Sequence, residues 1–320
     1  MDVQLKIHRF VEGKKWVDTY TVPITTGLTV LNALTYVKEK LDPTLSFTSA
    51  CRSSICGACA VRVNGNAELS CEVLVEDLLA RYQAEELTIE PLGNFSVIRD
   101  LVVDWDPKYA RIKKVKPTLH PKDEFTPETG CLQSPEDFNK YKKYAGCILC
   151  GSCVSECNKN TLNADDFLDP FAFVKAEKLV ADSRSKTPAE HLKAVLDAGL
   201  WRCFNCQECT AKCPKGLDPA GAIEKLKEAT FRHHLDDNVG ARHAKAIYDD
   251  ISESGTLDES KLNIKSEGYF MSALRLPMAL RLMNTGKMDP LASHPVNPEI
   301  KTIAAIVKAA EQADKEEAKL

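Results

Sequence analysis

The residues of this sequence best suited to chemistry are its thirteen cysteines, of which twelve fall into three tight groups of four. The groups are Cys51, Cys56, Cys59 and Cys71; Cys147, Cys150, Cys153 and Cys157; and Cys203, Cys206, Cys209 and Cys213. Cysteines this close in sequence are badly placed to form disulfides with each other, whereas their thiolates converge easily on one inorganic centre. We therefore expect a metal framework that is loaded in the reducing cytoplasm.

The first group has the spacing of a plant-type [2Fe–2S] loop. Four residues separate Cys51 from Cys56, two separate Cys56 from Cys59, and Cys71 follows later. Small residues around Gly57 would let backbone N–H groups point at the sulfurs. Zinc is the alternative, but zinc ribbons use paired C-x2-C knuckles. The sequence predicts one [2Fe–2S] cluster on these four cysteines.

The second and third groups share the pattern C-x2-C-x2-C-x3-C, and Pro214 follows the last cysteine. This is the pattern of two-cluster bacterial ferredoxins, in which the fourth cysteine of each motif ligates the cluster of the other motif. The first [4Fe–4S] cluster is thus assigned to Cys147, Cys150, Cys153 and Cys213, and the second to Cys157, Cys203, Cys206 and Cys209. Cys131 is left over, and we expect a plain free thiol there.

The elements that must hold the first group are a sheet and a helix. Alternating apolar residues at 3–10 and 16–22 predict two paired strands, and helical spacing over 29–40 predicts a helix. Further strands are expected at 60–63 and 87–90. This order is typical of a β-grasp ferredoxin.

The rest of the chain has a helical pattern. Residues 109–123 are rich in cations and are interpreted as a solvated linker. Helices are expected to begin at Pro170, Pro188 and Pro219, and Gly199 is expected to end the second of them. The two four-cysteine motifs lie about 56 residues apart, as in a weak internal duplication.

The predicted fold class is therefore α+β. A β-grasp plant-type [2Fe–2S] ferredoxin domain is expected at 1–106, an all-α bacterial-type double-cubane ferredoxin domain at 107–235, and a helical C-terminal extension at 236–320.

Composition narrows the function further. With 320 residues, 44% hydrophobic residues and a net charge of −4, the chain can build sizeable cores and is not expected to bind nucleic acid. It has neither an apolar run of membrane-spanning length nor a signal-peptide pattern. We find no phosphate-cradling glycine loop, flavin fingerprint or nucleophile–base pair. We predict an electron carrier that has no catalytic residues of its own.

Several segments resemble the iron–sulfur subunit of succinate dehydrogenase and fumarate reductase. They are SACRSSICGAC at 49–59, LSC at 69–71, EPLGNF at 90–95, RDLVVD at 99–104 and CPKGLDP at 213–219. The resemblance covers roughly residues 1–230. It implies a quinone-linked oxidoreductase complex of anaerobic respiration, in which a flavoprotein subunit interconverts succinate and fumarate on FAD. This chain would carry electrons between that FAD and a (mena)quinone site at the membrane.

The chain departs from that family at Cys206, where most members have an aliphatic residue or serine and a [3Fe–4S] last centre. We therefore expect a full second [4Fe–4S] cluster, with a lower potential because a fourth thiolate adds negative charge. Residues 158–161 also replace the proline, serine and tryptophans that line the usual quinone pocket, so that site is in doubt.

The tail, 269–294, resembles the end of the two-cubane subunit of heterodisulfide reductases. Its apolar residues at helical spacing suit a docking or membrane-surface helix or core packing, and both interpretations stay open. Together with Cys206, the tail suggests a complex of the less common, 8-methylmenaquinol:fumarate reductase-like type. In that type the quinone-side subunit is cysteine-rich and peripheral.

Three alternatives are weighed against this interpretation. The chain could belong to a thiol- or disulfide-linked fumarate reductase, it could be a free-standing multi-cluster ferredoxin, or it could be a structural zinc protein. We expect a peripheral location on the inner membrane, by default on the cytoplasmic face. A partner exported with a twin-arginine signal would place it on the periplasmic face instead. The direction of the reaction in vivo is not encoded in these motifs.

Overall fold

The computed structural model describes residues 2–287 and 295–317, with side chains as far as residue 313. The chain divides into two compact units, Met1–Ala229 and Thr230–Leu320, which are described separately. Within the described ranges, every helix is too short or too polar to cross a bilayer.

The first unit opens with a five-stranded sheet of order β2-β1-β5-β3-β4. Its strands are β1 (Asp2–Val11), β2 (Lys14–Pro23), β3 (Ala60–Val63), β4 (Asn66–Leu69) and β5 (Glu86–Glu90). Strand β1 pairs antiparallel with β2 and parallel with β5. Its alternate residues Val3, Leu5 and Ile7 are fully buried, as the apolar alternation predicts. The predicted strand pair is confirmed.

Helices pack on this sheet and complete its core. They are α1 (Val30–Tyr36), continued by a π-helical turn η1 (Val37–Leu41), and α2 (Val75–Tyr82). The Thr29 hydroxyl accepts a hydrogen bond from the Asn32 N–H at 3.1 Å and so caps α1. Val30, Leu34 and Val37 join the core of the sheet. The helix predicted at 29–40 is confirmed, with its last turn widened.

A buried arginine ties the sheet to the loops beyond it. Arg9 is 4% exposed and pairs with the fully buried Asp100 at 3.0 Å, and with Asp42 at 2.6 Å. Asp100 lies between the two strands of a small hairpin, β6 (Val97–Arg99) and β7 (Val102–Val103). Removing one partner from such a buried pair costs about 3–5 kcal/mol, so this cluster is a main anchor of the hairpin.

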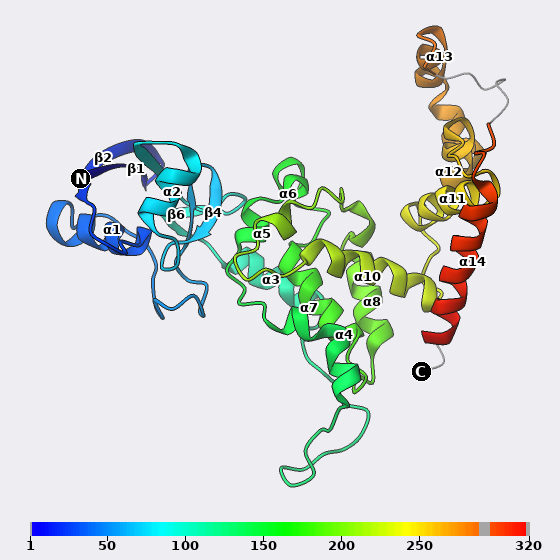
Figure 1. Cartoon of the computed structure of the whole chain (residues 1–320), viewed down its shortest axis with the longest axis horizontal. Coiled ribbons are helices and arrows are strands. Elements are labelled where there is room, and N and C mark those ends of the chain that lie inside the picture. The colour runs from blue at the N-terminus through cyan, green and yellow to red at the C-terminus, as the bar shows by residue number, and fades with distance from the viewer. Residues whose placement is uncertain (1, 288–294, 318–320) are drawn as a thin grey trace. The chain divides into compact units, whose positions relative to one another are not determined.

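The remainder of the first unit is helical. Its helices are α3 (Asp106–Lys114), α4 (Pro135–Ala145), α5 (Ser152–Ser155), α6 (Asn158–Leu162), α7 (Pro170–Val180), α8 (Pro188–Asp197), η2 (Leu200–Arg202), α9 (Glu208–Ala211) and α10 (Pro219–Arg232). Helices α7, α8 and α10 begin at the predicted prolines, and Gly199 follows α8 with φ 89°. Figure 1 shows the sheet with α1 and α2 in blue and cyan and these helices in cyan to yellow.

The prediction of a solvated linker at 109–123 is wrong at its start. Helix α3 extends to Lys114, and Ile112 and Val115 are buried. Lys108 and Arg111 lie 3.3 and 3.0 Å from the buried carboxylate of Asp169. The charge run thus belongs to an amphipathic helix. Lys108 and Arg111 neutralise a buried acid, Lys113 and Lys114 stay exposed, and the apolar residues join the core.

The second unit consists of the end of α10 followed by α11 (Val239–Ser254), α12 (Glu259–Leu274), α13 (Leu276–Asn284) and α14 (Ile300–Glu317). Helix α11 packs against α12 and α14. The predicted tail 269–294 is helical through Asn284, and its residues 288–294 lie outside the described part. The domain boundaries at 106 and 235 stay predictions.

Candidate iron–sulfur centres

The loop that carries the first cysteine group curls around its own sulfurs. Arg52, Ser54 and Gly57 have φ of 58°, 57° and 74°, a left-handed conformation that turns consecutive N–H groups to one side. The N–H groups of Ser53, Ile55 and Cys56 donate to Cys51 Sγ at 3.3, 3.4 and 3.3 Å, and that of Ser54 donates to Cys71 Sγ at 3.3 Å. Such a loop stabilises negative charge on sulfur.

The thiol chemistry of this loop fits a metal centre. The N–H groups of Ser53, Ile55 and Cys56 lower the pKa of the Cys51 thiol to about 6. Burial raises the pKa of Cys59, just before β3, to about 11. Metal ligation requires thiolates, and the loop supplies donors where that charge would lie. The chemistry of the loop is compatible with a metal centre, and Cys51, Cys56, Cys59 and Cys71 stay the predicted ligands of the [2Fe–2S] cluster.

The eight cysteines of the other two groups line two small cavities. Cys147, Cys150, Cys153 and Cys213 line one, and Cys157, Cys203, Cys206 and Cys209 line the other. Each cavity thus receives three cysteines from one motif and the fourth from the other motif. Burial raises the pKa of Cys209 to about 12 and that of Cys153 well above its usual value. Binding of a metal centre would remove these protons.

The two motifs have the same backbone shape. Leu149 and Gly151 have φ of 55° and 83°, and the equivalent Asn205 and Gln207 have φ of 53° and 63°. One turn of helix follows in each case, α5 and α9. The duplication inferred from cysteine spacing therefore extends to backbone conformation, including left-handed positions that three non-glycine residues occupy.

The first motif packs closely on the [2Fe–2S] part of the unit. A Cβ atom added at Gly57 would lie 2.8 Å from Cys150 Cα. One at Gly151 would lie 2.9 Å from the rings of Phe95 and Trp105. Both glycines therefore permit a backbone approach that a side chain would block. The motif that supplies three thiols of the first cavity is in direct contact with the [2Fe–2S] loop.

Asn94 strengthens this junction. Its side-chain amide donates to the carbonyls of Val154, Ser155 and Cys157 at 2.8, 3.1 and 3.2 Å. Asn94 itself has φ 60°. Sequence reasoning did not single out this residue, although it lies within the EPLGNF segment. A polar residue in a turn gives no sign of a partner about sixty residues away.

The residues after Cys157 are largely structural. Lys159 and Asn160 are buried, with Lys159 Nζ 2.5 Å from Asp166 and Asn160 Nδ2 2.8 Å from Asp169. Asn158 is exposed, and its Nδ2 points at Cys206 Sγ from 3.7 Å. This segment thus gives the second cavity a hydrogen-bond donor.

Cys131 lies apart from both cavities. It is half-buried, and its carbonyl accepts a hydrogen bond from Arg184 at 3.2 Å. Arg184 is held by Asp182 at 2.7 Å. The position of Cys131 is compatible with the predicted free thiol.

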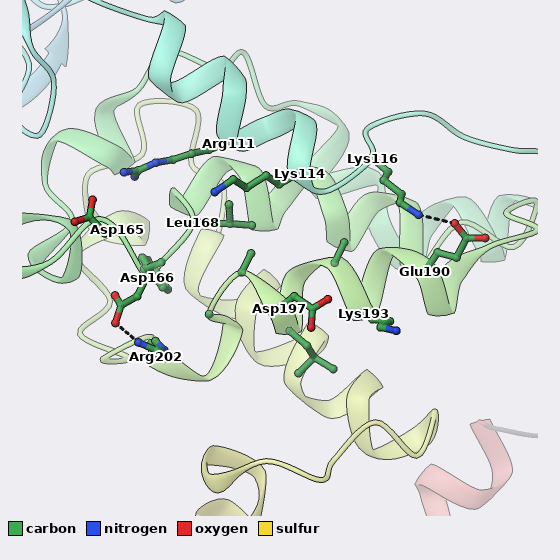
Figure 2. Close-up of a pocket in the computed structure, with 15 residues that line it drawn as sticks. Arg111, Lys114, Lys116, Asp165, Asp166, Leu168, Glu190, Lys193, Asp197 and Arg202 are labelled. Atoms are coloured by element: carbon green, nitrogen blue, oxygen red, sulfur yellow. Dashed lines mark hydrogen bonds and ion pairs between the residues drawn. The ribbon is translucent and has the colours of Figure 1, made fainter.

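A larger cavity, about 630 Å³, lies beside α3 and α8. Figure 2 shows that charged side chains surround it, with Lys116 and Glu190 paired at 2.8 Å and Arg202 paired with Asp166. Its lining residues include five bases and four acids but no cysteine. Because the five bases are nearly balanced by the four acids, the cavity does not have the strong positive charge that would favour an anionic substrate.

Two family profiles match the two cysteine-bearing parts of the chain. A 2Fe-2S iron-sulfur cluster binding domain matches residues 4–110, and a 4Fe-4S dicluster domain matches residues 143–217. The sites and these profiles define an iron–sulfur protein with a [2Fe–2S] domain followed by a [4Fe–4S] dicluster domain.

Similar proteins identify the family. The 8-methylmenaquinol:fumarate reductase iron-sulfur subunit of Wolinella succinogenes is 44% identical over 289 residues, which cover 89% of this chain and 90% of the relative. The fumarate reductase iron-sulfur subunit of Mycobacterium tuberculosis is 38% identical over 227 residues, covering 70% of this chain and 90% of the relative. The chain belongs to the family of fumarate reductase iron–sulfur subunits.

The fold has a solved counterpart in the Sdh1 complex of Mycobacterium smegmatis in the apo form. The match has a TM-score of 0.66 at 23% sequence identity and covers 74% of this chain and 98% of that chain. This likeness shows that the two chains share a fold.

Proposed function

We propose that this chain relays electrons between a flavoprotein subunit, which interconverts fumarate and succinate on FAD, and a menaquinone site at the membrane. The clusters supply one-electron carriers, and the protein holds them in a fixed series. The observation that carries the proposal is the contact of Gly57 with Cys150. It brings the [2Fe–2S] loop against the first of two cavities, each of which takes three cysteines from one motif and the fourth from the other motif.

The two cavities support the proposed ligands of the [4Fe–4S] clusters, and the N–H groups that donate to sulfur support those of the [2Fe–2S] cluster. Cys51, Cys56, Cys59 and Cys71 hold the [2Fe–2S] cluster; Cys147, Cys150, Cys153 and Cys213 hold the first [4Fe–4S] cluster; and Cys157, Cys203, Cys206 and Cys209 hold the second. The strand order β2-β1-β5-β3-β4 supports a β-grasp ferredoxin domain. The exchange of Cys157 and Cys213 between the two motifs supports a double-cubane domain.

The type of fumarate reductase complex is proposed from the presence of Cys206 and from how much of this chain its relatives match. The W. succinogenes relative is named for 8-methylmenaquinol and matches 89% of this chain, more than the first unit alone contains. We therefore propose a complex with a cysteine-rich quinone-side subunit, peripheral on the cell membrane. The cytoplasmic face is the default, and the periplasmic face applies if the flavoprotein carries a twin-arginine signal.

Electron paramagnetic resonance tests the cluster content. The oxidised complex should give no [3Fe–4S] signal, and reduction should reveal one [2Fe–2S] spectrum and two interacting [4Fe–4S] spectra. A strong signal in the oxidised state, after oxidative loss of iron has been excluded, would contradict the assignment of Cys206. A colourless protein would support structural zinc instead.

Copurification and turnover test the relay. The tagged chain should bring down a flavoprotein, and the complex should reduce fumarate with a reduced menaquinone analogue. Isolation of the chain alone as a freely diffusing carrier would favour a ferredoxin. Fumarate reduction driven by thiols instead of quinol would favour the thiol-linked reductase.

A further inference from the structure

The second unit exposes a continuous apolar segment at residues 268–287, here called the docking segment. Phe270 is 77% exposed, Leu274 63% and Met278 62%, and Tyr269, Leu276 and Met283 are also exposed. Scattered exposed apolar residues are normal, but a contiguous patch marks an interaction site.

The backbone turns this segment away from the helices of its own unit. Helix α12 has non-helical φ and ψ of 82° and 172° at Gly268, and beyond this kink its large apolar side chains are exposed. Helix α13 has no buried residue. Figure 1 shows α13, in orange, beyond the ends of α11 and α14, and of the described elements it contacts only α12 to any extent. Within the described residues, its own unit therefore leaves the segment uncovered.

The composition of the segment favours a protein as its occupant. Between Gly268 and Lys287 there are three methionines, two aromatic residues and two arginines, with no aspartate or glutamate and with Lys287 as the only lysine. Aromatic residues, methionine and arginine are enriched at the cores of protein interfaces, where lysine and acids are depleted. A helix lying on a membrane instead has a strongly charged face rich in lysine and arginine.

The charges indicate what the partner surface must offer. Arg275 is paired within the chain, with Glu267 at 2.6 Å. Arg281 is exposed on α13, and the structure records no acid beside it among the described residues. An apolar groove with a carboxylate at its rim would match this segment, as in other helix-in-groove complexes.

The relatives indicate which subunit of the complex would cover the docking segment. The W. succinogenes protein matches 89% of this chain, so its match must extend well into the second unit, since the first unit ends at Ala229. The M. tuberculosis protein matches 70%, a length that the first unit can hold by itself. The second unit is thus not needed by every fumarate reductase, and the quinone side is the part in which these complexes are proposed to differ.

We propose that residues 268–287, which contain the end of α12 and the whole of α13, dock into an apolar, acid-rimmed groove of the quinone-side subunit. The identity of that subunit rests on the proposed function.

The test uses the whole complex, purified through a tag on this chain. The double variant Leu274→Ser/Met278→Ser changes two exposed side chains and should leave the fold intact. It should lower the amount of quinone-side subunit per complex about tenfold or more, because central apolar contacts dominate interface energy. Quinol-driven fumarate reduction should fall with it, while the flavoprotein, dye-driven fumarate reduction and the cluster spectra are retained. Ile306→Ser on α14, also an exposed apolar position at 64%, is the matched control and should retain all subunits.

Retention of the quinone-side subunit by the double variant would overturn the proposal. So would loss of binding to phosphatidylglycerol vesicles with that subunit still present, because lipid would then be the occupant. Absence of a flavoprotein from the wild-type complex, with the third subunit still bound through this segment, would instead contradict the proposed function and leave the docking proposal supported.

Discussion

The two four-cysteine motifs have the same backbone, but they differ in the burial of their second cysteines, Cys150 and Cys206. In the first, Cys150, Gly151 and Cys153 are buried beneath the [2Fe–2S] part of the unit. In the second, Phe204 and Cys206 are exposed. The duplicated loop therefore sets the backbone conformation that positions the cysteine sulfurs. The packing around each loop decides whether those sulfurs are buried next to another cluster-binding part or exposed to a partner protein. We interpret the first motif as the internal step of the relay and the second as its exit.

The largest expected effect concerns Cys157 and Cys213, the fourth cysteines that the two motifs exchange. Cys213→Ser should abolish the first [4Fe–4S] cluster although it lies in the second motif, and Cys157→Ser should abolish the second cluster. Iron analysis and reduced-state resonance spectra would measure this, since only the first cluster should strongly relax the [2Fe–2S] signal. If each change removed the cluster of its own motif, the exchange would be wrong. Cys131→Ser should change neither cluster.

The equivalent left-handed positions should respond unequally to alanine. Gly151→Ala introduces strain at φ 83° and a clash with Phe95 and Trp105, which together should cost about 2–4 kcal/mol. Gln207→Ala, at φ 63°, replaces one side chain by another in solvent and should stay within about 0.5 kcal/mol. The denaturant midpoint for loss of cluster absorbance measures both. Equal midpoints would show that the surroundings of the first motif matter less than its packing implies.

Cys206→Ser tests the role of the exposed cysteine of the second motif. Removal of a thiolate at this accessible corner should convert the second cluster to a three-iron form with a signal in the oxidised state. Its potential should rise because one negative charge is lost. Redox titration followed by resonance spectroscopy measures the shift, and the first cluster should titrate as before. An unchanged four-iron spectrum would mean that another group replaces Cys206.

The smallest expected effect comes from the residue after each fourth cysteine. The side-chain amide of Asn158 donates toward Cys206 Sγ. The equivalent residue in the other motif, Pro214, has no side-chain donor and no backbone N–H. Asn158→Ala should lower the potential of the second cluster, since hydrogen bonds to sulfur help set cluster potentials. The shift should be smaller than that of Cys206→Ser. A rise in the same titration would contradict the role given to Asn158.

The sequence predicts what depends on local pattern. Cysteine spacing indicated the two groupings that line the cavities, prolines marked the starts of α7, α8 and α10, and alternation marked β1 and β2. Asn94 and the approach of Gly57 to Cys150 could not be predicted, because each depends on contacts between residues far apart in the chain. The charge run at 109–114 was misinterpreted for a similar reason. Arg111 was taken for a solvated cation because its partner, Asp169, lies about sixty residues away, whereas Lys113 and Lys114 are exposed as expected.

The three hydrogen bonds from Asn94 have a kinetic consequence. They join the turn after β5 to the backbone of α5 and of Cys157, so the two cluster-bearing parts are held together before any partner binds. The first internal electron transfer should therefore need no swinging motion of a tethered carrier. Its rate should be first order and independent of both protein concentration and solvent viscosity.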